Sequence, residues 1–278
     1  MRLQIYITKR YLTNKSLLFW GFLFMIFWAV IGAFIMGSSI QRNLPPEAFQ
    51  LYTASWFGIL ALLSFSSMGV TAMYSLSYHT GAIPYLRRYS RMRASDYISG
   101  IVMAGVVTSV IYGLVLAAVV YGLYSYHFGA QLPPRDLPLI VAASVAAGLF
   151  FVSLSAFIKL IQIKCLGLSP ASEQAVNFIP LILGYGFGFA GFYLNLGSLA
   201  VYASPFVDIE YLLVDGYYGR VLHMAALATP LPLTASGQPF SVWLGMLSLA
   251  AWAAALLGIS VYLFDLMYFR NVYEAKLF

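Results

Sequence analysis

Long hydrophobic runs alternate with short polar segments along almost the whole chain. Six of these runs are long enough to cross a bilayer as helices, because about 20 apolar residues span the hydrocarbon core. The predicted spans are Leu17–Gly37, Leu51–Leu76, Ile98–Tyr124, Leu137–Ile161, Ala175–Leu199 and Val242–Tyr268. The pattern predicts an all-α polytopic membrane protein, with residues 1–278 forming a single transmembrane domain.

A shorter element is expected before the first span. The segment 1–16, MRLQIYITKRYLTNKS, has apolar residues spaced as one helical face: Leu3, Ile7, Tyr11 and Leu12. This spacing, with basic residues around it, predicts an interfacial helix lying along the membrane surface. A merely solvated basic tail is the alternative.

The connection before the last span, 200–240, contains SPFVDIEYLLVDG, which has the marks of a short helix. Ser204 can cap its amino end, Pro205 suits the first helical position, and Gly216 can stop it. The element is too short to span, so it is expected to be re-entrant and dip into the outer leaflet, or else to lie on the outer surface as an amphipathic helix. The residues assigned to it are Ser204, Pro205, Asp208, Glu210 and Tyr211.

The basic residues predict how the chain is oriented. The two ends, the connection 77–97 and the Lys159–Lys164 segment hold 12 of the 15 Lys and Arg residues, against three (Arg42, Arg135 and Arg220) in the other connections. By the positive-inside rule, both termini are expected in the cytoplasm of a multi-pass protein of the cell membrane.

Two sets of small or polar residues lie within the predicted spans. Ser64, Ser67 and Thr71 of the second span, with Asn177 and Asn195 of the fifth, could line a polar path. Helix packing explains the hydroxyls equally well, because such groups can bond to a carbonyl of their own helix. Gly184, Gly188 and Gly191 form a flat strip for close backbone approach, either within the chain or at a dimer seam.

Catalytic motifs are absent from the sequence. It contains no HExxH, GxSxG or GxxxxGK[ST] motif and no EF-hand loop, so it is not expected to be an enzyme or to bind a cofactor or metal itself. The basic residues form no soluble patch, which argues against nucleic acid as a partner. Ionisable groups are nearly absent from the predicted spans, which argues against an ion-coupled pump.

The order of these features resembles the membrane subunits of type 2 ABC exporters. The resemblance covers essentially the whole chain: an amphipathic amino end, six spans, the basic sequence YHTGAIPYLRRYSRMRASDY after the second span, and SPFVDIEYLL before the last. His79 stands where that family often has an acidic residue, and no proline follows Leu86. In the family's pattern, a cytoplasmic coupling helix between spans 2 and 3 would correspond to Gly81, Ile83, Tyr85, Leu86, Arg87, Arg88 and Arg91.

The resemblance implies a permease half that pairs with a second copy or a paralogue. ATP and Mg²⁺ would be held by two separate ABC ATPase subunits, whose closure the coupling helix would transmit. The interleaved apolar side chains and arginines at 81–93 suit docking in a groove, although a simple anchor on lipid headgroups is the alternative. The rival classes are an ion-coupled secondary transporter or channel, and a membrane scaffold or assembly factor.

Overall fold

The computed structural model describes residues 2–40, 44–80, 94–162, 170–224, 227 and 238–268. These residues form helices and connections without a strand, apart from an isolated bridge between His223 and Pro239. The segments long and apolar enough to cross a membrane number five: Lys15–Ser39, Pro46–Leu76, Ile98–Phe128, Leu137–Ile161 and Val242–Leu263. The chain is therefore an all-helical, multi-pass membrane protein.

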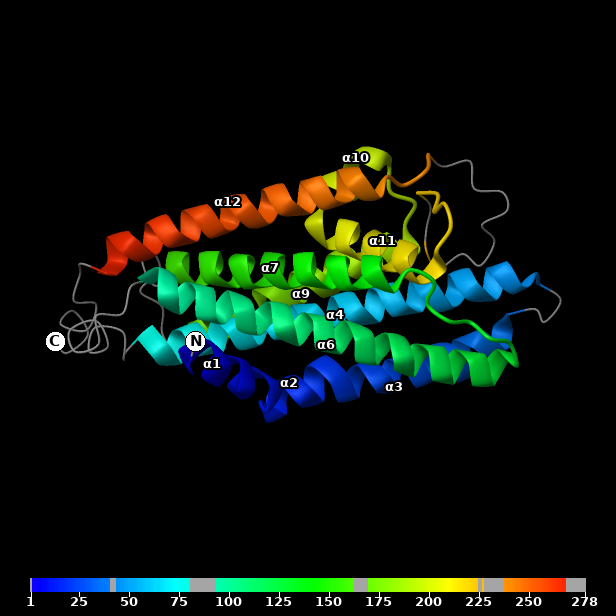
Figure 1. The fold of residues 1–278 in the computed structure, drawn as a ribbon, viewed down its shortest axis with the longest axis horizontal. Helices are drawn as coiled ribbons and strands as arrows, with labels where there is room; N and C mark the ends of the chain where they lie inside the picture. The colour runs from blue at the N-terminus through cyan, green and yellow to red at the C-terminus, as the bar shows by residue number, and fades with distance from the viewer. Residues whose placement is uncertain are drawn as a thin grey trace.

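The long helices lie side by side, and one of them, α6, runs in the direction opposite to the other three (Figure 1). They are α4 (Pro46–Thr80), α6 (Ala94–Phe128), α7 (Leu137–Ile161) and α12 (Val242–Tyr268). One end of the bundle, called here the α1 end, holds α1 (Arg2–Leu12) together with the close of α4 and the start of α6. The opposite end, called here the α11 end, holds the start of α4 and the short helix α11 (Pro205–Tyr218).

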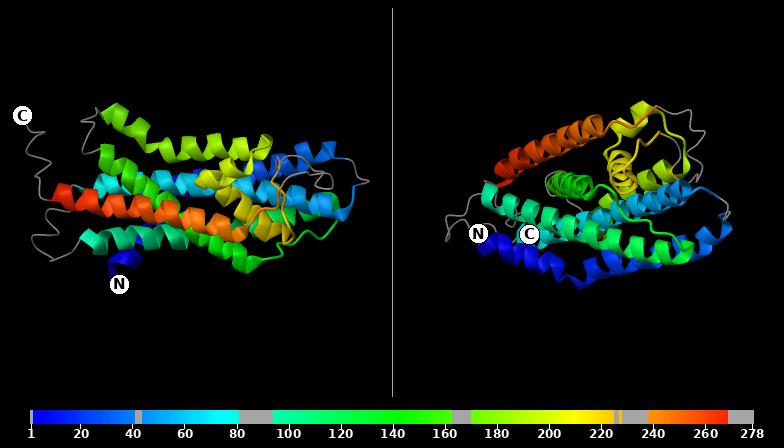
Figure 2. Two further views of the ribbon diagram at one scale, coloured as in Figure 1. Left: turned by 90° about the horizontal axis from the view of Figure 1, so that it is seen from above. Right: turned by 45° about the vertical axis from the view of Figure 1, so that its right-hand side comes forward.

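Helix α4 forms the centre of the bundle. It packs against α6, α7, α11 and α9 (Ile179–Tyr193) and against the first span, as the two further views also show (Figure 2). Almost every side chain from Leu51 to Leu76 is buried, including the hydroxyl-bearing ones. Hydropathy predicts that a helix is apolar enough for a bilayer, but α4 is surrounded by protein and not by lipid.

The first span and α12 lie at the edge of the bundle. Large apolar side chains on both are exposed, for example Trp20 and Phe27 on the first span and Trp243 and Leu247 on α12. The bilayer can cover such side chains, because lipid tails are as apolar as the residues themselves. Within the first span, a π-helical turn at Phe19–Leu23 joins α2 (Lys15–Leu18) to α3 (Phe24–Val30), and a second one, Ile31–Met36, follows α3.

The predicted fifth span, Ala175–Leu199, differs most from its prediction. The helix breaks at Phe178, between α8 (Pro170–Asn177) and α9, and α9 ends at Tyr193. Residues 194–197 are not helical, and α10 (Ser198–Ala203) follows. At 1.5 Å per residue, α9 alone is roughly 22 Å long, less than the ~30 Å hydrocarbon core. The six-span layout therefore stays a prediction for this segment.

The amino-terminal helix packs against protein. Ile7 and Tyr11 of α1 are buried, and α1 lies along α6, where a Cβ atom on Gly100 would be 3.1 Å from Ile7 Cδ1. Ile5 and Tyr6 on the same helix are exposed. Asn14 then caps α2, its Oδ1 accepting hydrogen bonds from the backbone nitrogens of Ser16 and Leu17.

Candidate functional site

The candidate functional site is built around helix α11. It lies inside the bundle, against α4, α7, α9 and α12, and all its residues from Pro205 to Tyr218 are buried except Asp215. The alternative of an amphipathic helix on the outer surface is therefore wrong. At 14 residues α11 is too short to cross a membrane, so it stands as an inserted helix among longer neighbours.

The two ends of α11 differ in how well the sequence predicted them. Pro205 stands in the first turn as expected, but Ser204 makes no side-chain hydrogen bond to cap the helix. The helix does not stop at Gly216. It continues to Tyr218 and ends at Gly219, which has a φ of 65° that glycine tolerates best. Gly216 instead allows close packing, because a Cβ there would be 3.0 Å from Ile140 Cγ1 of α7.

Hydrogen bonds tie the carboxyl end of α11 to its neighbours. The Gly216 and Tyr217 carbonyls accept from the backbone nitrogens of Asp136 and Arg135, at 2.9 and 3.2 Å. The Tyr217 hydroxyl donates to the Leu132 carbonyl at 2.9 Å. Gln50 of α4 donates through Nε2 to the carbonyls of Pro133 and Tyr217. These hydrogen bonds fix the position of α11 relative to α4 and to the segment before α7.

Removing the Tyr217 hydroxyl should loosen this attachment. In Tyr217→Phe the buried Leu132 carbonyl loses its donor, and leaving a buried polar group unsatisfied costs about 1–3 kcal/mol. We expect a lower thermal unfolding midpoint for the purified protein in detergent. Tyr126→Phe is the matched control, because the Tyr126 side chain is 82% exposed. Equal midpoints for the two variants would show that the bond contributes nothing.

Two carboxyl groups of α11 are buried without partners. Asp208 and Glu210 are both 0% exposed, and none of their carboxyl oxygens has a hydrogen-bond partner among the described residues. Each lies against a glycine: a Cβ on Gly245 of α12 would be 2.5 Å from Asp208 Oδ1, and one on Gly191 of α9 would be 2.6 Å from Glu210 Oε2. Ionisable groups therefore do occur inside the bundle, although the spans themselves contain few of them.

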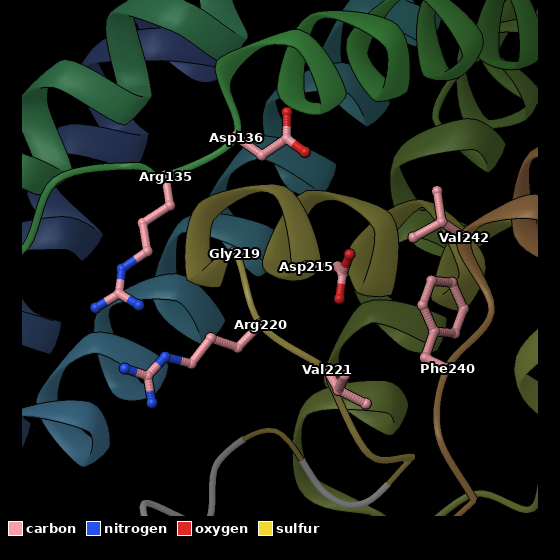
Figure 3. A pocket seen from close by; sticks show the side chains of 8 residues that line it. All are labelled: Arg135, Asp136, Asp215, Gly219, Arg220, Val221, Phe240 and Val242. Carbon is pink, nitrogen blue, oxygen red and sulfur yellow. The ribbon is translucent and has the colours of Figure 1, made fainter.

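A polar pocket of about 470 Å³ lies at the carboxyl end of α11. Figure 3 shows Arg135 and Arg220 on one side of it, and Asp215 and Phe240 on the other. Arg220 forms an ion pair with Glu47 at the start of α4. Burial, and after it the neighbouring Asp136 carboxylate, raise the pKa of Asp215 to about 6. The pocket thus combines both signs of charge at the α11 end.

The hydroxyls of α4 bond to backbone carbonyls. Ser67 and Thr71 donate to the carbonyl four residues earlier in their own helix, while Ser64 donates across to the Gly21 carbonyl of the first span at 2.5 Å. All three side chains are buried. Asn195 is exposed beyond the end of α9, so it does not join them. These bonds favour the packing interpretation of the hydroxyls over the polar path.

The glycine strip of α9 is covered by the same chain. Cβ atoms on Gly184 and Gly188 would lie 2.7 Å from Ser66 Cβ and 2.8 Å from Leu62 Cδ2 of α4, and Gly191 faces α11. Because these glycines have no side chain, the backbone of α9 can come close to α4 and to α11. Within one chain it is therefore an internal seam.

A buried lysine lies near the α1 end of the bundle. Lys159 is 1% exposed inside α7, and its Nζ donates to Gln162 Oε1 at 3.1 Å and to Asn177 Oδ1 of α8 at 3.4 Å. The sequence had assigned Lys159 to a polar connection and Asn177 to a path. The structure brings the two together, so they connect α7 to α8.

The predicted coupling residues cannot be placed. Gly81, Ile83, Tyr85, Leu86, Arg87, Arg88 and Arg91 all lie outside the described residues. The helices on either side are described, however. The close of α4 and the start of α6 both lie at the α1 end, so the basic stretch connects two helices there.

No family model matches the sequence, and no curated protein matches it either. The functional argument therefore depends on the residues and their geometry.

Proposed function

We propose that this chain is the membrane subunit of a type 2 ABC exporter, working with separately encoded ATPase subunits that bind ATP and Mg²⁺. The observation that carries the proposal is α11, with α10 before it: a short helix buried in the bundle just ahead of the last long helix, at the end opposite the close of α4 and the start of α6. An inserted helix at this point is the arrangement that the resemblance implies.

Further support comes from the placement of the charged segments. Helix α1 lies at the same end of the bundle as the close of α4 and the start of α6. Together, α1 and the sequence between α4 and α6 contain seven of the 15 basic residues. In our proposal this end faces the cytoplasm, where ATPase subunits can reach it. A second copy of the chain or a paralogue would complete the translocation path in the cell membrane.

The proposed orientation predicts a labelling pattern. In a Cys165→Ser background, a cysteine at Gln131, which is exposed at the α11 end, should react with an impermeant thiol reagent in intact cells. A cysteine at Ser90 should react only after the cells are permeabilised, since the positive-inside rule places the basic stretch in the cytoplasm. A cysteine at Gln41, outside the described residues, should behave like the one at Gln131. Labelling of Ser90 in intact cells would overturn the orientation.

One observation favours a second candidate, an ion-coupled transporter. Asp208 and Glu210 are unpaired carboxyl groups inside the bundle, and intramembrane acidic residues often mark ion pathways. The two candidates differ in their energy source. Capture of an ATP-hydrolysing partner from native membranes supports the exporter. Uptake of a solute into vesicles that contain this chain alone, driven by a pH gradient, supports the ion-coupled transporter.

A further inference from the structure

Glu210 and Asp208 differ from the other acidic side chains around α11. Glu47 pairs with Arg220, Asp136 accepts a hydrogen bond from the Leu139 nitrogen at the start of α7, and Asp215 borders the open pocket. Glu210 and Asp208, in contrast, are fully buried and lack any donor within the described part of the chain. An ionised carboxylate so placed is strongly disfavoured, because it has lost water without gaining a partner.

The Glu210 carboxyl fits between two glycines. Its Cγ would be 3.5 Å from a Cβ on Gly58 of α4, and its Oε2 would be 2.6 Å from a Cβ on Gly191 of α9. Val207, one turn earlier on α11, closes the space beside Gly191. The missing Cβ atoms leave room for the carboxyl itself, with apolar and backbone atoms around it.

Asp208 lies on a different face of α11. Its Oδ1 points to Gly245 of α12, and the Phe240 ring approaches the same glycine, at 2.9 Å from where a Cβ would be. Opening the α11–α12 contact would expose Asp208, while opening the α11–α9 contact would expose Glu210. The two carboxyls are therefore buried by two separate contacts of α11, one with α12 and one with α9.

A metal ion does not suit these positions. Hard cations need several oxygen ligands at once, and the described residues contain no group of three side chains that could hold a metal. A proton needs only the carboxyl group. It removes the charge where the group is packed and is released to water where the group is exposed.

We propose that Glu210 and Asp208 form a proton-binding pair, each holding a proton while α11 is packed and releasing it when α11 separates from α9 or α12. Proton binding and the packing of α11 are then linked. A carboxyl that ionises less readily when packed than when exposed contributes stability at low pH, and that contribution is lost as the pH rises.

The other charged groups near α11 are placed apart from the two carboxyls: Arg135 and Arg220 line the pocket at the carboxyl end of the helix. On α4 Glu47 is paired with Arg220, and on α7 Lys159 lies beside Gln162 and Asn177 at the far end of the bundle. Asp136 caps α7. Helices α9 and α10 contain no ionisable acid or base other than tyrosine, and Asp265, the acidic residue of α12, is near that helix's distant end. The pKa of Asp215 is also raised, so this residue would contribute to the same signal. The test therefore replaces it.

The test uses infrared spectroscopy on the full-length chain in lipid nanodiscs, in an Asp215→Asn background. At neutral pH we expect the carbonyl-stretching band of protonated carboxyl groups, with one component lost in Glu210→Gln and another in Asp208→Asn. Both variants are neutral near-isosteres of the protonated acid, so folding should survive. In the Asp215→Asn chain without further substitutions, the band should disappear as the pH is raised. This measurement tests the proposal even if neither variant folds.

Thermal unfolding provides the second measurement. The background chain should lose stability as the pH rises from 6 to 9, and the Glu210→Gln/Asp208→Asn double variant should lose markedly less. Absence of the carboxyl band at neutral pH, or the same pH dependence in chain and double variant, would overturn the proposal. Neither readout requires an ATPase, so failure here is distinguishable from failure of the exporter proposal.

Discussion

Gly184→Leu and Gly188→Leu are expected to destabilise the protein strongly. Each adds a branched side chain where a single Cβ would already lie within 2.8 Å of α4 atoms. Overpacking a close contact typically costs about 1–3 kcal/mol and sometimes more, and here α9 would have to move away from α4. We expect the double variant to lose its monodisperse profile in detergent and each single variant to unfold at a lower temperature.

Gly186→Leu is the matched control on the same helix. Gly186 is exposed, and a Cβ atom there would meet nothing within 4 Å. A surface substitution of this kind usually changes stability by no more than about 0.5 kcal/mol. If Gly184→Leu and Gly188→Leu behave like Gly186→Leu, α9 does not pack on α4 through this strip.

Tyr85→Ala combined with Leu86→Ala should abolish coupling to the ATPase. In our proposal these side chains fill a groove on the ATPase subunit, and a few buried anchors supply most of the binding energy of an interface. Arg87, Arg88, Arg91 and Arg93 all remain in this variant, so membrane insertion should be unchanged. We expect loss of ATPase binding in a pull-down and loss of transport-stimulated ATP hydrolysis.

Replacing the four arginines by glutamine separates docking from anchoring. Those variants should disturb orientation or membrane attachment as well as ATPase binding, because basic residues determine orientation and interact with anionic headgroups. If the Tyr85/Leu86 double variant binds its ATPase and supports normal hydrolysis, the stretch serves only as an anchor. The coupling role would then have to be assigned to another segment.

Much of the fold follows from the hydrophobic pattern alone. The runs at 51–76, 98–124 and 137–161 are each contained in a long helix, and the helix 242–268 has the predicted bounds. The segment before α12 was also predicted as a short helix, because Ser204, Pro205 and a following glycine are local signals. Long apolar runs and helix-end residues are local signals, so they can be recognised from the sequence alone.

Burial could not be predicted in the same way. Hydropathy does not distinguish a helix facing lipid from one facing protein, so nothing in α4 indicated that it is the centre of the bundle. The same limit applies to Lys159, Asp208 and Glu210, which become buried through contacts with helices distant in sequence. The sequence carries no usable signal for these contacts, because only the fold reveals that Asp208 meets Gly245 and Glu210 meets Gly191.

Helix ends that depend on packing were also mispredicted. Gly216 has the residue type of a helix stop, yet α11 continues past it and ends at Gly219, which has a positive φ. Gly216 instead lies close to Ile140 of α7. At the fifth span, the apolar run to Leu199 concealed the end of α9 at Tyr193.

The central claim is that this chain works with an ATPase that it does not itself contain. The most direct measurement is to purify the tagged full-length chain from its native membrane in mild detergent, then assay ATP hydrolysis and identify every subunit in the eluate. We predict a separate subunit with a GxxxxGK[ST] motif and ATP hydrolysis that disappears when the lysine of that motif is replaced. A chain that purifies without such a subunit and without ATP hydrolysis would contradict the account.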